Sequence, residues 1–436
     1  MTTAPTGTTP GPDATDPTDP TDPTDPTDPS EAADVRLQRY AELVVRVGLN
    51  VQPGQPVHVR ADLDHATVAR AVVEQAYLAG ASAVTVDYTD PHVRRSTLVH
   101  APMETLTTTP GWRLQQVHHL QETRGATLTL TGNADPHLFD GIPAERVGAV
   151  PMDLAIASRA LLDAGDVAWA VVAAPNAGWA KQVFGEPDLE RLWEAVAVAM
   201  RLDEADVVAA WREHAAALHA RGRALEALEL DSVRYVGEGT DLTVGLIPGS
   251  RWVSGSVETN AGVPFMPNLP TEEVFTSPDR RRADGTIRLT RPLVMPRAGV
   301  VVEGLEVRFE GGRVVDVTAD SGVEAVRVEL VTVEGARSLG EVSLVDGSSR
   351  VRAAGVVFHN TLYDENAGCH VAWGQGFSMV LPGTSPDQQA AAGLNSSAVH
   401  TDVVVGGPGV DVVGTTRDGR SVELFTDDTW VLPVLP

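Results

Sequence analysis

Eight side chains in the second half of the chain are of the types that bind divalent metal ions. They lie in four short segments, PNLPTEEVFTSPD, LGEVSLVD, TLYDENAGCH and AVHTD. The eight residues are Glu272, Glu273, Glu341, Asp364, Glu365, His370, His400 and Asp402. Carboxylates and imidazoles without a thiolate suit zinc, cobalt, manganese or magnesium. This set therefore indicates a site for two divalent metal ions.

His400 and Asp402 lie in a segment whose composition is typical of a β-strand. Residues i and i+2 of a strand face the same side, so both side chains can reach one ion. The next three residues are valines, which indicates a partly buried strand where an unpartnered polar pair would be costly. A surface strand with two solvated polar side chains is the alternative interpretation.

The glutamates have different surroundings in the sequence. Glu272 and Glu273 are adjacent, so in an extended segment they point in opposite directions. We expect at most one of them to enter a shared site and the other to be solvated. Glu341 precedes the largely apolar run VSLV. A carboxylate entering a buried strand needs a cation or hydrogen-bond donors as partners.

Glu365 and His370 are five residues apart, with Cys369 between them. If residues 364–372 are helical, the two side chains lie about a turn and a half apart and need not converge. A hydrogen-bonded core histidine is the alternative for His370. Cys369 is the only cysteine, so a disulfide within the chain and a cysteine-based zinc site are excluded. We expect Cys369 to be a small buried residue and not a nucleophile.

Other functional classes lack their sequence signals. The sequence has no His-Glu-x-x-His, no Gly-x-Ser-x-Gly and no Gly-x-x-x-x-Gly-Lys motif. The net charge is -26 and the pI about 4.7, which argues against nucleic acid and anionic membranes as partners.

We see no secretory signal and no apolar run of the roughly 18 residues that a membrane helix needs. A single cysteine suits a reducing compartment, so we expect a cytoplasmic protein.

Two regions that differ in their pattern of predicted helices and strands must position these side chains. Between residues 36 and 228, strands alternate with helices, which is typical of an α/β domain with a parallel sheet. The predicted strands cover residues 56–61, 83–88, 126–130 and 167–174, and the predicted helices include residues 36–47, 66–78, 188–200 and 205–227. From residue 229 to 436, short valine-rich strands separated by turns predict a β-rich, mostly antiparallel domain that binds the metals.

The first residues belong to neither region. From Thr15 to Pro29 the triplet Thr-Asp-Pro is repeated five times, and it offers almost nothing apolar to bury. We expect residues 1–35 to be a disordered acidic tail. The length of 436 residues then fits two domains, and the 43% of hydrophobic residues suffices for a large core.

The longer motifs resemble those of metal-dependent aminopeptidases of the aminopeptidase T and aminopeptidase S type. The resemblance runs from about Tyr40 to near the C-terminus. Its motifs are, in order, RVGLNVQPGQ, GWAKQVF, GTDLTVGL, PNLPTEEVFTSPDR, VEGL, EGARSLGEVSLV, TLYDENAGCH and HTD. It implies an α/β N-terminal domain, a β-rich metal-binding C-terminal domain and a homodimer.

The resemblance also implies roles for individual residues. It selects Glu273 over Glu272 as a metal ligand, and it implies that Glu341 is the catalytic carboxylate shared by both ions. The other implied ligands are Glu365, His370, His400 and Asp402. Glu273 is expected to bind one ion and Glu365 with His370 the other, while the allocation of the last two ligands stays open.

The implied activity is removal of N-terminal residues from peptides that have a free amine, by water activated between two metal ions. One carboxylate would pass the proton to the leaving amine, and the sequence does not say which. The chain departs from the family at Phe377, where a tyrosine is usual, and at Asn395-Ser396-Ser397, where Asn-Glu-Ser is usual. We expect Phe377, Asn395 and Ser396 to lie around the metals.

These departures leave two alternatives open. One is a catalytically altered or inactive relative that acts as a metal-bound structural or peptide-binding protein. The other is a metal-dependent amidase or dipeptidase, which activity on a blocked N-terminus would favour.

Overall fold

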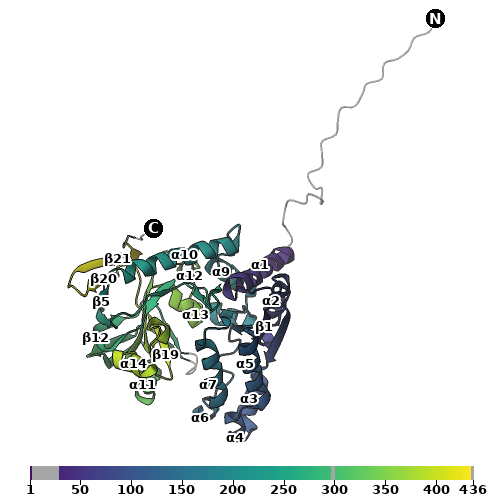
Figure 1. The fold of residues 1–436 in the computed structure, drawn as a ribbon, viewed down its shortest axis with the longest axis horizontal. Helices are drawn as coiled ribbons and strands as arrows, with labels where there is room; N and C mark the ends of the chain where they lie inside the picture. Colours follow the sequence, from purple (N-terminus) through teal and green to yellow (C-terminus); the bar gives the residue numbers. More distant parts are fainter. Residues whose placement is uncertain (2–28, 296–299, 434–436) are drawn as a thin grey trace.

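The computed structural model describes residue 1 and residues 29–295 and 300–433. An α/β region and a β-rich region lie side by side in it (Figure 1). The helix α1 (Pro29–Leu43) begins within the stretch that we expected to be a disordered tail, so residues 29–35 are helical. The rest of that predicted tail, residues 2–28, lies outside the described residues. Among the described residues, no helix is long and apolar enough to cross a membrane.

The α/β region is built on a five-stranded sheet in which every strand pair is parallel, in the order β10-β4-β3-β1-β2. Its strands are β1 (Pro56–Asp62), β2 (Ala83–Thr89), β3 (Ala126–Thr131), β4 (Ala168–Ala173) and β10 (Asn268–Leu269). Its longer helices include α2 (Ala66–Leu78), α3 (Pro91–His100), α5 (Gly111–Thr123), α7 (Met152–Asp163), α8 (Ala177–Phe184), α9 (Leu189–Ala199) and α10 (Val207–Glu226). The predicted parallel α/β sheet is confirmed.

The two faces of this sheet are covered differently. Residues Val57 and Val59 of β1 are buried in the main core, which also receives α1, α2 and α9. The opposite face meets α5 and α7, whose apolar side chains form a small separate cluster with Val167. Because side chains alternate along a strand, His58 and Arg60, which alternate with those valines, face α5 and α7.

The β-rich region contains two large antiparallel sheets and two sheets of two strands each. The small ones pair β8 (Val257–Glu258) with β9 (Pro264–Phe265) and β13 (Leu293–Met295) with β14 (Val300–Val302). The larger of the two large sheets has the order β16-β15-β12-β6-β5-β20-β21-β22. Its strands are β5 (Leu230–Gly237), β6 (Thr240–Leu246), β12 (Pro278–Arg288), β15 (Glu306–Glu310), β16 (Arg313–Thr318), β20 (Asp411–Thr416), β21 (Ser421–Thr426) and β22 (Thr429–Trp430). The other large sheet, which we call the smaller antiparallel sheet, has the order β19-β18-β17-β11-β7. Its strands are β7 (Val253–Ser254), β11 (Glu273–Thr276), β17 (Leu339–Val345), β18 (His370–Gly374) and β19 (His400–Val404). The predicted mostly antiparallel architecture is confirmed.

The two regions share a core. The boundary predicted near residue 228 falls in the turn between α10 and β5. Yet β10, which follows that boundary in sequence, is the edge strand of the α/β sheet and pairs with β4. Phe265, Leu269, Phe358 and Tyr363 are likewise buried in the main core of the α/β region. The contact between the regions therefore contains apolar packing as well as the cleft described below.

Candidate metal centre

The smaller antiparallel sheet positions five of the six predicted ligands. Glu273 begins β11, Glu341 lies on β17 and His370 begins β18. His400 and Asp402 lie two residues apart on β19, and His400 Nε2 is 3.1 Å from Asp402 Oδ1. The prediction that these two side chains share one face of a strand is therefore confirmed.

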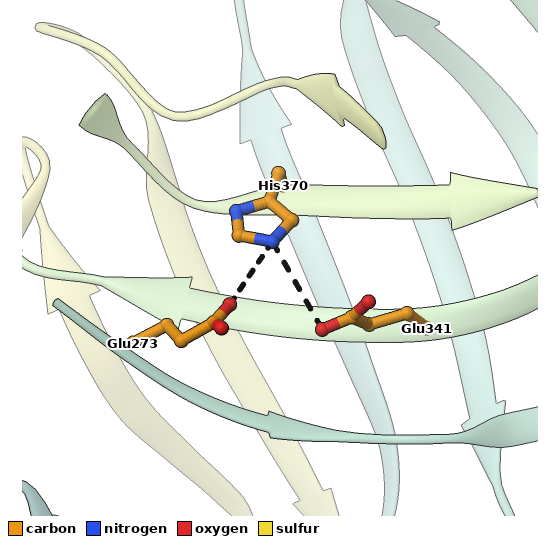
Figure 2. A group of neighbouring side chains, drawn as sticks. All are labelled: Glu273, Glu341 and His370. Carbon is orange, nitrogen blue, oxygen red and sulfur yellow. Dashed lines mark ion pairs between the residues drawn. The ribbon is translucent and has the colours of Figure 1, made fainter. Parts of the chain in front are cut away.

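The ligand atoms of these residues form two groups that meet at Glu341. In the first group, His370 Nε2 lies 3.1 Å from Glu273 Oε2 and 4.0 Å from Glu341 Oε1 (Figure 2). In the second group, His400 Nε2 lies 2.9 Å from Glu341 Oε2 and 3.1 Å from Asp402 Oδ1. The two oxygens of the Glu341 carboxylate thus face different histidines. This geometry suits a carboxylate shared between two cations.

Backbone carbonyls orient both imidazole rings. His400 Nδ1 lies 2.7 Å from the carbonyl oxygen of Gln375, and His370 Nδ1 lies 3.2 Å from that of Gly368. A ring nitrogen that donates to a carbonyl leaves the other nitrogen available as a metal ligand, and outer hydrogen bonds of this kind are usual around metal sites. In both residues the available atom is Nε2, which faces the carboxylates.

The electrostatics of the centre reflect crowded, buried carboxylates. Burial raises the pKa of Glu341 to about 7, with a further contribution from the charge of Glu273. Burial by itself lowers the pKa of His370, but the hydrogen bond and charge of Glu273 outweigh it and raise that pKa to about 9. Burial also raises the pKa of Glu365 well above its usual range, and the charge of Asp402 adds to this shift.

The charges and ligand types of these residues show whether the centre suits a bound cation. Four carboxylates and two imidazoles share the centre, so negative groups outnumber the groups that can be positive. Burying such a set is costly without positive charge between the carboxylates. The oxygen and nitrogen ligand types match zinc, cobalt, manganese or magnesium. The residues present therefore fit divalent metal ions.

The metal centre lies in a cleft of about 180 Å³ between the two regions. Trp169 of β4 and Asn268 of β10 line it from the α/β side. The β-rich side supplies an apolar wall that consists of Val253, Phe275, Phe377 and Met379. A ligand in this cleft would contact the metal-binding groups and apolar side chains at the same time.

Comparison with known proteins places this geometry in a family. The family model described as thermophilic metalloprotease (M29) matches residues 33–430. The chain is 41% identical to aminopeptidase T of Thermus aquaticus over 404 residues, which is 91% of this chain and 98% of the relative. The chain belongs to the M29 metalloprotease family. It is also 36% identical to aminopeptidase PepS of Streptococcus thermophilus over 407 residues, again 91% of this chain and 98% of the relative.

Solved structures agree with the family assignment. Wild-type AmpT from Thermus thermophilus has a TM-score of 0.82 and 38% identity, covering 91% of this chain and 99% of that chain. A 2,5-dihydroxypyridine dioxygenase from Pseudomonas putida has a TM-score of 0.55 at 13% identity, which shows likeness of fold alone. The M29 metalloproteases are metal-dependent enzymes that act on peptide bonds, and this chain is one of them.

Two of the eight candidate ligands of this M29 metalloprotease have other partners. Glu272 was expected to be solvated if Glu273 entered the site, but it is buried and forms an ion pair with Arg201 (Nη1–Oε1 2.6 Å). The Asp364 carboxylate accepts hydrogen bonds from the backbone N–H groups of Phe358 and Asn360. Asp364 therefore stabilises its own loop and does not line the metal cleft.

The segment from Glu365 to His370 differs from the helix that we considered. A short helix, α13 (Thr361–Asp364), is followed by a 3-10 turn at Glu365–Ala367, and the strand β18 begins at His370. The structure groups His370 with Glu273 and Glu341, whereas we expected His370 and Glu365 to bind the same ion. Glu365 lies instead near Asp402, whose charge helps to raise the pKa of the Glu365 carboxyl. Glu365 lines the same cleft as His370, but its carboxylate is in neither of the two groups of ligand atoms.

The three residues expected around the metals occupy different positions. Phe377 lines the cleft, and its ring packs against the His400 ring. The Asn395 side chain donates to the carbonyl oxygens of Gly335, Ser338 and Gly374, so it braces the backbone near β17 and β18. Ser396 follows it in the same loop, and its carbonyl oxygen lies close to Gly335. Neither Asn395 nor Ser396 lines the cleft.

Two residues that hold the metal ligands in place were not among the predicted site residues. Ser343 is fully buried on β17, and its hydroxyl donates to Glu273 Oε2 at 2.6 Å. Asn366 accepts a hydrogen bond from the Glu272 backbone N–H at 2.6 Å, and its amide donates to the Leu362 carbonyl at 3.0 Å. Asn366 therefore ties the segment that carries Glu273 to the segment that carries Glu365. Both residues lie close in sequence to ligands, which is the one hint that the sequence offers.

Proposed function

We propose that this chain is an aminopeptidase that releases N-terminal residues from peptides with the help of two divalent metal ions. The observation that carries the proposal is the shared position of Glu341 between two groups of ligand atoms. One ion would be held by Glu273, Glu341 and His370. The other would be held by Glu341, Glu365, His400 and Asp402. The aminopeptidase activity of the relatives supports the proposal.

The chemistry follows from the ligand set and the cleft. Two bound divalent ions supply an activated water near neutral pH and polarise the carbonyl of the peptide bond that is cleaved. The carboxylates give the cleft a negative potential, which attracts the protonated α-amine of a peptide. The apolar wall that includes Phe275 and Phe377 holds the first side chain and excludes water. Glu341 is the residue whose loss disturbs both halves of the centre.

Cellular location and assembly belong to the same proposal. We propose a cytoplasmic enzyme that forms a homodimer, with a peptide as its partner in the cleft and no nucleic acid or membrane partner. The single buried cysteine supports a reducing compartment, and the net charge of -26 argues against nucleic acid and anionic membranes. The homodimer rests on the family resemblance.

Hydrolysis of aminoacyl-p-nitroanilides tests the proposed function. The metal-stripped protein is assayed with zinc, cobalt, manganese or magnesium added back, and metal content is measured in parallel. Glu341→Gln should bind fewer ions and lose turnover, because Gln cannot supply a carboxylate to both. Glu238→Gln removes a carboxylate from an exposed turn and should behave like the parent chain. An N-acetylated substrate should not be cleaved.

The contrary outcomes point to the alternatives. Two ions bound without turnover would support a structural or peptide-binding relative, for which the apolar Phe377 ring against His400 is the motivating observation. Turnover of N-acetylated substrates would support an amidase.

A further inference from the structure

A second cavity, of about 120 Å³, lies in the α/β region between its sheet and the helices α5 and α7. Three neighbouring strands supply its floor. The floor residues are His58 and Arg60 of β1, Thr127 and Thr129 of β3, and Trp169 and Val171 of β4. The polar residues of its roof are Arg113 and Gln116 of α5 and Ser158 of α7. The floor positions alternate along each strand, so these side chains share one face of the sheet.

Two arginines give this cavity a positive character in a chain whose net charge is -26. Within residues 29–295 and 300–433, neither Arg60 nor Arg113 has a carboxylate oxygen within 4.0 Å. The acid in the neighbouring strand, Asp87, accepts hydrogen bonds from Gln116 (2.9 Å) and pairs with His58 (2.8 Å). Arginine binds carboxylates strongly because its planar fork can donate two parallel hydrogen bonds. The Arg113 guanidinium stacks on the Trp112 ring, 5.0 Å from its centroid, and this contact leaves its N–H groups available. The cavity therefore offers two guanidinium groups without a carboxylate partner to an anion.

The register of the sheet connects this cavity to the metal cleft. Asn268 lines the metal cleft, and it is aligned with Val171 of β4. Val171 is aligned with Thr129, and Thr129 with Arg60. Aligned residues of parallel strands face the same side, so one row of side chains leads from the metal cleft to Arg60. Trp169 lines both the cleft and the cavity.

The distance along the row from Asn268 to Arg60 can be compared with the length of an extended peptide. From β10 to β1 it crosses three strand spacings of roughly 4.8 Å, or about 14 Å in all. An extended peptide rises about 3.3 Å per residue, so about four residues span that distance. A short peptide with its amine at the metal centre could therefore reach the arginines with its other end.

We propose that Arg60 and Arg113 bind the C-terminal carboxylate of short peptides whose N-terminus lies at the metal centre. This inference rests on the proposed aminopeptidase function and adds a substrate class to it: free peptides of about four residues. A dipeptide is too short to reach the arginines, and a peptide with a C-terminal amide lacks the charge that they bind.

Matched peptides test the inference on the metal-loaded protein. Leu-Gly, Leu-Gly-Gly and Leu-Gly-Gly-Gly are compared as free acids and as C-terminal amides, with leucine p-nitroanilide as a substrate without a carboxylate. The free acid should have a KM about 10-fold or more below that of the amide for Leu-Gly-Gly-Gly, because hydrogen bonds to charged groups contribute about 1.5–3 kcal/mol. The dipeptide acid and amide should differ little.

Variants separate carboxylate binding from general damage. Arg60→Gln and Arg113→Gln should raise KM for the Leu-Gly-Gly-Gly free acid and leave kcat unchanged, because the contact is made equally in the ground and transition states. Arg60→Lys should retain part of the preference, since it keeps the charge and loses the fork. Arg70→Gln on α2 removes an exposed arginine from another part of the same region and should change nothing. Leucine p-nitroanilide should be hydrolysed normally by every variant.

The outcomes distinguish this inference from the proposed function. Normal hydrolysis of leucine p-nitroanilide with equal KM for acids and amides would overturn the carboxylate site alone. Equal losses on acids and amides in Arg60→Gln and Arg113→Gln would also overturn it. No hydrolysis of any substrate by the metal-loaded parent chain would overturn both proposals.

Discussion

The ring of Phe377 lies 4.9 Å from the ring of His400, centroid to centroid, with the two planes inclined at 56°. Phe377 also contacts Phe275, at 5.2 Å. An apolar ring therefore covers one side of a predicted metal ligand, at the position where the family resemblance leads us to expect a tyrosine. A phenyl ring without a hydroxyl group therefore lies beside the candidate metal centre.

Adding a hydroxyl group at position 377 should increase catalysis. We expect Phe377→Tyr to raise kcat by about 10²-fold if the hydroxyl stabilises the transition state, which is the usual contribution of a single donor of this kind. KM should change little, and the measurement is steady-state hydrolysis of an aminoacyl-p-nitroanilide. Phe275→Tyr adds a hydroxyl elsewhere on the same wall and is the matched control. Equal effects of the two substitutions would show that position 377 has no special role.

Removing the hydrogen bond from Ser343 should weaken metal binding. The Ser343 hydroxyl donates to Glu273 Oε2, so Ser343→Ala leaves that carboxylate less well oriented. Losing an outer partner of a metal ligand typically costs about 10- to 100-fold in affinity. Competition with a chelating dye measures the affinity. Ser421→Ala, at an exposed position of β21, provides the control, and unchanged affinity in Ser343→Ala would contradict the assignment.

The ion pair between Arg201 and Glu272 should be important for stability. Both side chains are largely buried, at 11% and 6% exposure. Burial lowers the pKa of the neighbouring His214, against the charge of Glu272, so Arg201 is the cation that balances this carboxylate. Arg201→Met leaves the carboxylate unpaired, and we expect the free energy of unfolding to fall by about 3–5 kcal/mol.

Urea unfolding followed by circular dichroism measures this loss. Arg234→Met breaks an exposed pair with Asp241 that water and salt screen, and we expect it to destabilise the protein far less than Arg201→Met. If the two variants are destabilised equally, the buried pair has no special contribution.

The thiol of Cys369 should be unreactive in the folded protein. Cys369 is 1% exposed, and burial raises its pKa to about 12, so little thiolate forms at pH 8. A disulfide reagent at pH 8 should label it slowly in the native chain and rapidly in guanidinium chloride. Because the unfolded thiol loses its proton at about pH 8.5 and the folded thiol does not, this group lowers stability as pH rises from about 9 toward 12. Rapid labelling of the native protein would show that the β18 segment opens.

Local patterns in the sequence determined much of the fold. The predicted helix at residues 66–78 has those bounds in α2, and the predicted strand at 56–61 corresponds to β1 (Pro56–Asp62). The spacing of His400 and Asp402 likewise predicted their common face. These successes have one cause: the periods of helices and strands are local, so a few consecutive residues reveal them.

Tertiary structure alone decided which distant groups meet. The sequence could not give Glu272 its partner, because Arg201 lies 71 positions away and only packing of the two regions brings them together. It could not place His370 beside Glu273, since a turn at Glu365–Ala367 and the register of β18 determine that contact. The shared carboxylate of Glu341 and the row from Asn268 to Arg60 arise in the same way. Side chains converge through strand order and sheet packing, which join residues far apart in the chain and leave no periodic trace in it.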